Sequence, residues 1–243
     1  MPSVYELAQI SNASYDYSPN LKGWEKIESN TTNLFSVDGF FSAMFQKGNQ
    51  YVIVFRGTDD FTNDAISDAT LSLGFPPQQL GRAKQVVNSA LRRINQPNIN
   101  VTLTGHSLGG GLASLLSAKG HNFPVVTFNA PGMYRAGTLT GFSAAASAYN
   151  YLADTNGIRT YINEFKKVLH IRSEGDLVSI GAGRKIIKNT KTLKNPYCPR
   201  VEGLNPISIA AQAAAKTLCA HSMEKLLLTI NTIPEFKEEI VWS

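Results

Sequence analysis

The sequence has little of what marks several classes of protein. It holds only two cysteines among 243 residues, which excludes a framework of several disulfide bonds. We favour two unpaired thiols at Cys198 and Cys219 over a single bridge, which would need an oxidising compartment. No stretch is apolar over the length needed to cross a bilayer, so we expect any membrane contact to be peripheral.

The N-terminal segment, MPSVYELAQISNASYDYS, lacks a basic region followed by an apolar run. We therefore expect no cleavable secretory signal, and either a cytoplasmic protein or one secreted by a non-classical route. Charged residues are also few, at 17% of the chain, with a net charge of +5. An excess this small serves solubility, or it favours an anionic partner, either a lipid surface or nucleic acid.

The basic residues gather late in the chain, with no acidic residue between them. Five cations fall within eleven positions: Arg184, Lys185, Lys188, Lys191 and Lys194. We leave two interpretations open for this stretch. It is either a solvated loop or helix face, or a segment that lies against phosphate headgroups.

What the sequence does contain is an alternation of strand and helix patterns. The apolar spacing predicts helices at Val4 to Tyr15, Gln78 to Asn95, Leu108 to Lys119, Ala210 to Leu218 and Met223 to Ile230. It predicts strands at Phe35 to Phe45, Tyr51 to Phe55, Ile99 to Thr104, Pro124 to Phe128 and Val168 to Arg172, the first two forming a hairpin. A strand, a helix and a strand in succession require a parallel pair, so we predict an α/β fold with a mostly parallel central sheet and helices on both faces.

The length suits one α/β domain, and we assign residues 1–243 to it. Residues 59–77 are polar and acidic and end in Gly74-Phe75-Pro76-Pro77, which breaks regular structure, so we predict a long loop or lid there. Four apolar residues in this loop, Ile66, Leu71, Leu73 and Phe75, are either the apolar face of an interfacial lid or ordinary core residues.

One motif carries a specific chemical meaning. Gly105-His106-Ser107-Leu108-Gly109 matches G-x-S-x-G and lies between a predicted strand and a predicted helix. In α/β-hydrolases this arrangement is a nucleophile elbow, in which a strained serine sits on a sharp turn with glycines around it. We predict that Ser107 is a nucleophile. The alternative is a tight strand-to-helix turn without catalysis.

A serine hydroxyl needs a histidine to take its proton and a carboxylate to orient that histidine. Of the four histidines, His106 lies inside the turn and is expected to pack or hydrogen-bond locally. His121 falls on a predicted loop, and His170 falls inside a strand, where a structural role fits. We therefore assign the base to His221, which we expect on a loop late in the chain.

The acid should follow a sheet strand between the nucleophile and the base. Asp176 comes shortly after the strand at Val168 to Arg172 and fits this place. Glu174 is a nearby competitor and Asp154 a more distant one, and Asp176 could also be a simple loop or capping residue. The order Ser107, Asp176, His221 is the order found in α/β-hydrolases.

Two amide groups should hold the negative oxygen that forms on the substrate. Leu108 starts the helix after the nucleophile, where backbone N–H groups and the positive end of the helix dipole are available. Thr58 follows an earlier strand through Arg56-Gly57 and offers both an N–H and a hydroxyl. We predict an oxyanion hole formed by Thr58 and Leu108, although Thr58 could also belong to an ordinary polar turn.

These motifs together resemble the class 3, or fungal-type, lipase family. The resemblance rests on Phe55-Arg56-Gly57-Thr58, Thr104 to Gly110, Phe128-Asn129-Ala130-Pro131-Gly132, Asp176-Leu177-Val178 and His221. It implies the same triad and oxyanion hole. The chain departs from the family at Asn63 to Asp68, where the family often has an Asn-Trp pair, so the lid is expected to differ. The compact chain also resembles a bacterial branch with phospholipase A1 activity.

We therefore predict a serine ester hydrolase that acts on lipid acyl esters, with phospholipase A1 favoured over a triacylglycerol lipase or a general esterase. Neither a metal nor an organic cofactor is implied. The expected partner is a lipid ester at a membrane or lipid interface, with no nucleic acid. Two alternatives remain: a lipid-surface binding protein without turnover, and an amidase or peptidase, since the same triad serves acyl transfer in general.

Overall fold

A computed structural model gives the fold of the chain. It describes residues 1–15, 21–31, 40–57, 77–94, 99–117, 123–131, 167–176, 178–179, 189–199 and 206–242. Apart from Pro77, the predicted lid at 59–77 lies outside these ranges. The basic residues Arg184, Lys185 and Lys188 lie outside them as well.

The described strands form one seven-stranded sheet whose spatial order follows the chain. The strands are β1 (Glu25–Thr31), β2 (Phe41–Lys47), β3 (Gln50–Phe55), β4 (Asn100–His106), β5 (Val125–Phe128), β6 (Val168–Ser173) and β7 (Thr190–Leu193). The first three are antiparallel neighbours, and β3 to β7 run parallel. The carboxyl ends of β3 to β6 therefore meet at one edge, where open α/β sheets place their ligand sites.

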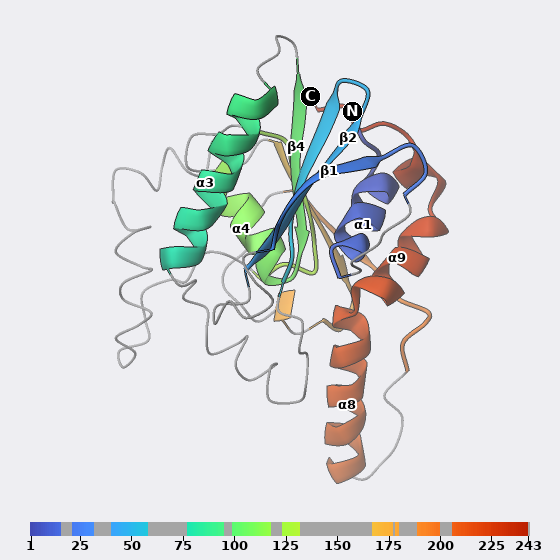
Figure 1. The fold of residues 1–243 in the computed structure, drawn as a ribbon. Coiled ribbons are helices and arrows are strands. Elements are labelled where there is room, and N and C mark those ends of the chain that lie inside the picture. The colour runs from blue at the N-terminus through green and yellow to red at the C-terminus, as the bar shows by residue number, and fades with distance from the viewer. Residues whose placement is uncertain are drawn as a thin grey trace.

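Helices cover both faces of this sheet (Figure 1). One face packs against α3 (Pro77–Ile94) and α4 (Leu108–Leu116), and the other packs against α1 (Val4–Ala13) and α9 (Met223–Asn231). A short 3-10 helix, η3 (Pro234–Lys237), adds the buried ring of Phe236 to the second layer. The helix α8 (Pro206–His221) leads directly into α9. The predicted α/β class with helices on both faces is confirmed.

The helices with strong apolar periodicity lie where the sequence placed them. Ser3 caps α1 by accepting a hydrogen bond from the Glu6 N–H, while the Glu6 carboxylate accepts one from the Ser3 N–H, which completes the predicted capping box. The hairpin of β2 and β3 also forms, although β2 starts at Phe41 and residues 35–39 lie outside the described ranges.

Two strands were missed, because both are polar edge elements. The strand β1 reads EKIESNT, and β7 reads TKTL, so neither shows the apolar alternation that predicts a half-buried strand. The second case corrects our interpretation of the basic stretch. Lys191 lies in a strand, with its Nζ 4.9 Å from the centre of the Phe236 ring, rather than in a solvated loop or helix.

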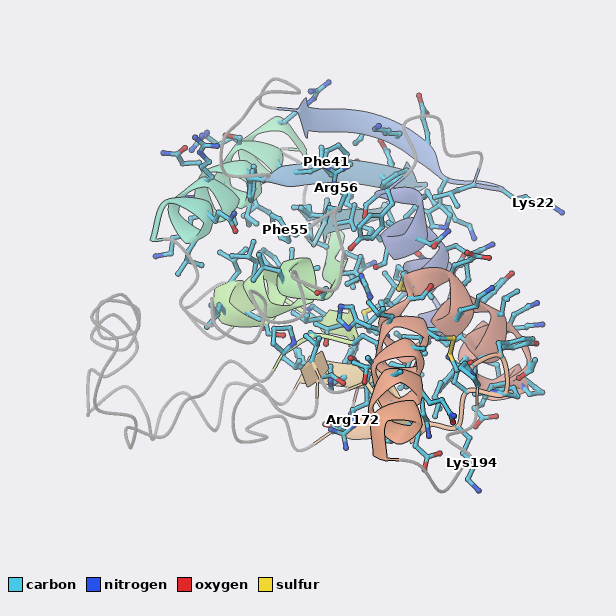
Figure 2. The ribbon with its side chains drawn as sticks, turned by 90° about the horizontal axis from the view of Figure 1, so that it is seen from below. Lys22, Phe41, Phe55, Arg56, Arg172 and Lys194 are labelled. Carbon is cyan, nitrogen blue, oxygen red and sulfur yellow. A yellow bond between two sulfur atoms is a disulfide. The ribbon has the colours of Figure 1, made fainter. Side chains whose placement is uncertain are left out.

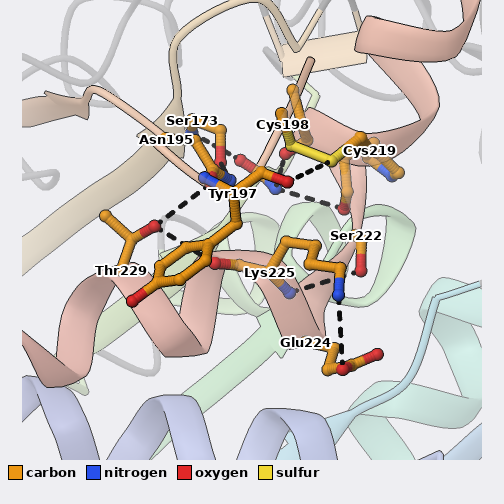
Figure 3. The surroundings of a disulfide bond; sticks show 12 residues. Ser173, Asn195, Tyr197, Cys198, Cys219, Ser222, Glu224, Lys225 and Thr229 are labelled. Atoms are coloured by element: carbon orange, nitrogen blue, oxygen red, sulfur yellow. Dashed lines mark hydrogen bonds and ion pairs between the residues drawn. A yellow bond between two sulfur atoms is a disulfide. The ribbon is translucent and has the colours of Figure 1, made fainter.

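The favoured state of the cysteines was wrong. Cys198 and Cys219 form a disulfide, with their Cα atoms 5.5 Å apart (Figure 3). The two are 21 residues apart in the sequence, but the segment after β7 returns to the C-terminal turn of α8. One of its cysteines, Cys219, comes two residues before His221 in the sequence. No helix in the described part of the chain has both the length and the apolar character to cross a membrane.

Candidate active site

Ser107 stands on a sharp turn between β4 and α4. Its backbone has φ 54° and ψ −130°, a strained conformation for a residue with a side chain. The turn exists because the glycines leave room: a Cβ on Gly105 would come within 2.6 Å of the Phe55 carbonyl oxygen, and a Cβ on Gly109 would overlap the same carbonyl. The geometry is that of a nucleophile elbow.

The three predicted triad residues meet at the carboxyl edge of the sheet. His221 Nε2 lies 2.9 Å from Ser107 Oγ, and His221 Nδ1 lies 2.9 Å from Asp176 Oδ1. Their exposed fractions are 2% for Ser107, 0% for Asp176 and 2% for His221. The imidazole thus bridges a hydroxyl and a carboxylate inside the protein, where the hydrogen bonds are little weakened by water.

Asp176 is held on a turn directly after β6. Gly175 occupies the left-handed region at φ +87°, which lets the chain reverse, and the Val178 N–H donates a hydrogen bond to Asp176 Oδ1 at 3.1 Å. The same oxygen faces the imidazole. Glu174, the competing acid, is exposed, and Asp154 lies outside the described residues.

His221 is the last residue of α8, whereas we expected it on a loop. From the helix end its imidazole reaches Ser107, and the following residue, Ser222, caps the next helix by accepting a hydrogen bond from the Lys225 N–H. Of the other histidines, His170 lies inside β6 and hydrogen-bonds Thr127 through Nδ1 at 2.8 Å, which fits the structural role expected for it. His121 lies outside the described residues.

Both ring nitrogens of His106 face groups other than the Ser107 hydroxyl. Its Nε2 donates a hydrogen bond to the backbone carbonyl of His221, and its Nδ1 faces the Tyr15 hydroxyl. Burial, and to a smaller extent the nearby His221, lowers the pKa of His106 from 6.5 to about 3, so the ring is neutral at ordinary pH. His106 therefore makes the local hydrogen bonds that we expected. One of them is to the main chain of His221, the predicted base.

Leu108 opens α4, so its N–H has no acceptor one turn earlier in the helix. The Ser107 N–H, by contrast, donates to the Phe128 carbonyl at 2.9 Å and is not available to a substrate. Thr58 lies outside the described residues, but Gly57 just before it lies close to the nucleophile. A Cβ on Gly57 would come within 2.9 Å of the Ser107 Cβ.

Arg56 fixes the direction in which the chain leaves β3. Its guanidinium carbon lies 4.6 Å from the centre of the Phe41 ring (Figure 2), and the backbone N–H of Arg56 donates to the Phe41 carbonyl. These contacts hold the end of β3 against the neighbouring strand.

Two polar residues beside the triad, Asn129 and Tyr15, were given no role from the sequence, although Asn129 lies in one of the motifs that carry the family resemblance. Asn129 follows β5 at the same sheet edge, is fully buried and has φ 47°. Its place at the carboxyl end of a parallel strand could have flagged it. Tyr15 lies near the N-terminus and does not follow a strand of the sheet, so its sequence position gave no indication of a role in the site. Within the described residues, no group of three or more His, Cys, Asp and Glu side chains is arranged to bind a metal ion.

Comparison with known proteins places the chain in a family. A family model described as a phospholipase-like, Tle-like phospholipase domain matches residues 6–215. The chain belongs to this family. A relative, the extracellular phospholipase A1 of Serratia liquefaciens, is 25% identical over 234 residues, which cover 92% of this chain and 69% of that protein.

Solved structures show the same fold at low sequence identity. The lipase of Rhizomucor miehei in its propeptide complex aligns with a TM-score of 0.53 and 15% identity, over 90% of this chain and 76% of that one. A mutant of MDLA from Penicillium cyclopium gives 0.53 and 14%, over 84% and 81%. The family and the fold together make the chain a lipid ester hydrolase of the α/β-hydrolase type, as the sequence predicted.

Proposed function

We propose that the protein is a phospholipase A1 that uses Ser107, His221 and Asp176 as a catalytic triad, with Leu108 and Thr58 as its oxyanion hole. One observation carries the triad: the His221 ring lies 2.9 Å from both the Ser107 hydroxyl and the Asp176 carboxylate. The turn geometry of Ser107 and its place before a helix give the hydroxyl a position from which it can attack.

The first half of the reaction transfers the acyl group to the enzyme. His221 Nε2 takes the proton of Ser107 Oγ as that oxygen attacks the ester carbonyl carbon. The negative charge that forms on the carbonyl oxygen is stabilised by the N–H groups of Leu108 and Thr58. His221 then gives its proton to the leaving glycerol oxygen, and the lysophospholipid departs.

The second half regenerates the enzyme. His221 takes a proton from a water molecule, whose oxygen attacks the acyl carbon on Ser107, and the fatty acid leaves as the proton returns to Ser107. Asp176 orients the imidazole throughout and stabilises its charged form. No redox step is involved.

A phospholipid substrate has support from two sides. The family is one of phospholipases, and the relative from Serratia liquefaciens is named a phospholipase A1. A net charge of +5 also suits peripheral contact with an anionic lipid surface. Triacylglycerol hydrolysis is the competing assignment.

Mass spectrometry of products tests the proposal. The protein is incubated with mixed phospholipid and triacylglycerol vesicles, and we expect lysophospholipid lacking the sn-1 chain, together with free fatty acid. Ser107→Ala should abolish both products, while Ser89→Ala, at an exposed serine on α3, should leave them unchanged. Fatty acid from triacylglycerol alone would contradict the phospholipase assignment. Binding to vesicles without any product would favour a non-catalytic lipid-binding protein.

The disulfide bears on the compartment in which the protein works. Such bonds persist in oxidising compartments, and the named relative is extracellular, so we infer that the protein works outside the reducing cytosol. Thiol alkylation after acid quenching of producing cells tests this inference. The secreted or periplasmic fraction should resist alkylation until it is reduced, and a fully alkylated active fraction would contradict it.

A further inference from the structure

The end of α8 poses a local problem. A helix leaves the carbonyl groups of its last turn without N–H donors inside the helix, and here that turn ends in the buried residues Ala220 and His221, the proposed base. The carbonyls of Ala220 and His221 need donors from elsewhere, since an unpaired buried carbonyl destabilises the arrangement that buries it.

Two side chains from the sheet edge supply those donors. His106 Nε2 donates to the His221 carbonyl at 2.7 Å. Asn129 Nδ2 donates to the same carbonyl at 3.1 Å and to the Ala220 carbonyl at 2.9 Å. His106 ends β4 and Asn129 directly follows β5, so the two donors come from adjacent parallel strands.

Asn129 also reaches the strand that carries the acid. Its Oδ1 accepts a hydrogen bond from the Ser173 N–H at 2.8 Å, and Ser173 ends β6, three residues before Asp176. The buried Asn129 amide therefore links the end of β6, which precedes Asp176, to the end of α8, which carries His221. These partners fix which end of the amide is oxygen, because carbonyls only accept and the N–H only donates.

The geometry of both residues suits a fixed role. Asn129 occupies the left-handed region at φ 47°, which asparagine tolerates better than most residues. Tyr15 donates its hydroxyl proton to His106 Nδ1 at 2.8 Å, which keeps the other ring nitrogen protonated and able to donate. The rings of His106 and His221 have centroids 4.8 Å apart, so a neutral His106 avoids repelling the imidazolium that forms on His221.

We propose that His106 and Asn129 are positioning residues that hold the main chain of His221, and through it the imidazole, between Ser107 and Asp176. This inference rests on the proposed triad. The two residues act through the His221 carbonyl and touch neither the substrate nor the reacting atoms. Their loss should lower kcat more than it raises KM, because an error of about 1 Å in a catalytic group can cost on the order of a hundredfold in rate.

A matched pair of amides at position 106 tests the His106 contact. Glutamine places its amide nitrogen where Nε2 stands and can still donate to the His221 carbonyl, whereas asparagine is one carbon shorter and cannot reach it. With a soluble short-chain ester, we expect His106→Gln to keep kcat within about threefold of the wild type. We expect His106→Asn to lose about tenfold or more, with KM within about twofold in both. Equal kcat values for the two variants would overturn the role of His106.

Asn129→Asp provides a second arm that does not depend on the first. It keeps the shape and the acceptor for the Ser173 N–H, but it places an oxygen against two carbonyl oxygens. We expect kcat to fall about a hundredfold with KM nearly unchanged, expressed per molecule that a fluorophosphonate labels to completion. An unchanged kcat would overturn the role of Asn129. A wild type without any turnover would instead refute the proposed function, so the two failures are distinguishable.

Discussion

The carboxyl group of Asp176 hydrogen-bonds both His221 and the Val178 N–H through Oδ1, while its buried Oδ2 has no hydrogen-bond partner among the described residues. The acid therefore depends on its charge and on one oxygen to orient the imidazole. Replacing the carboxylate by an uncharged group should leave the fold intact and disturb the orientation of the His221 imidazole.

Asp176→Asn should lower kcat by about a thousandfold or more with little change in KM, because the imidazole loses the charge that orients it and stabilises its protonated form. The matched control is Glu174→Gln, at the exposed acid two residues earlier. Initial rates on a soluble ester would check this. Equal losses for the two variants would mean that Asp176 is not the acid of the triad.

At this scale, part of the site was open to prediction from the sequence. Ser107 lies in a motif, and the order Ser107, Asp176, His221 together with the strand pattern was enough to select three residues that the structure brings together. The contacts of Asn129 and Tyr15 were not foreseeable in this way. Both depend on where the end of α8 returns to the sheet, and no local pattern encodes that.

Among the elements, the turn from β4 into α4 packs closely against the end of β3. A Cβ at Gly109 would overlap the carbonyl of Phe55, so the helix could not keep its approach to β3. We expect Gly109→Ala to lower the free energy of unfolding by about 3 kcal/mol, since backbone on both sides would have to move. Gly81→Ala on α3 is the control, because no atom lies within 4 Å of its added Cβ.

The control should be neutral or slightly stabilising, as alanine favours a helix over glycine by up to about 1 kcal/mol. Urea unfolding of both variants measures the difference. If Gly109→Ala and Gly81→Ala had the same midpoint, the close approach of α4 to β3 would be wrong.

The disulfide ties the segment after β7 to the last turn of α8. On the same segment, Asn195 accepts a hydrogen bond from the Thr229 hydroxyl and donates one to the Ser173 hydroxyl, so this corner joins β6, α8 and α9 (Figure 3). Replacing both cysteines by serine should cost about 3 kcal/mol for a closed loop of this length.

A loss of that size lowers Tm by roughly 6–12 °C in a chain of this size. Calorimetry with and without reductant would measure it. The sequence contains no other cysteine, so the double variant should not respond to reductant at all. If reductant did not change the Tm of the wild type, the disulfide would contribute nothing to stability.

Which elements could be predicted depended on their burial. The strands β3, β4 and β5 are apolar because both of their faces are covered, and α3 shows a clear apolar stripe, so all were found. The strands β1 and β7 lie at the two edges of the sheet and carry polar residues, so they were missed. The disulfide escaped prediction because its spacing in the sequence says nothing about where α8 ends.

For the whole molecule, the buried His106 makes stability depend on pH. Its pKa falls from 6.5 to about 3 on folding, so between these values the unfolded chain binds a proton that the folded chain does not. Stability from this residue is complete above pH 6.5 and is lost as the pH falls, at up to about 1.4 kcal/mol per pH unit.

His106→Gln removes this titration while keeping a donor to the His221 carbonyl. We expect the wild type to lose stability more steeply than this variant from pH 6.5 downward, with nearly parallel behaviour above pH 7. Chemical unfolding at pH 8, 7, 6, 5 and 4 would give both curves. The charged neighbours Asp176 and His221 are common to the two proteins, so they cancel in the comparison, and identical slopes would contradict a buried neutral His106.

The central claim is that His221 activates the hydroxyl of Ser107, and its most direct test is mapping of a fluorophosphonate adduct by peptide mass spectrometry. We expect one modified residue, Ser107, with a labelling rate that falls about a thousandfold or more in His221→Ala. An adduct on a different serine, or labelling of Ser107 at an unchanged rate in His221→Ala, would contradict it.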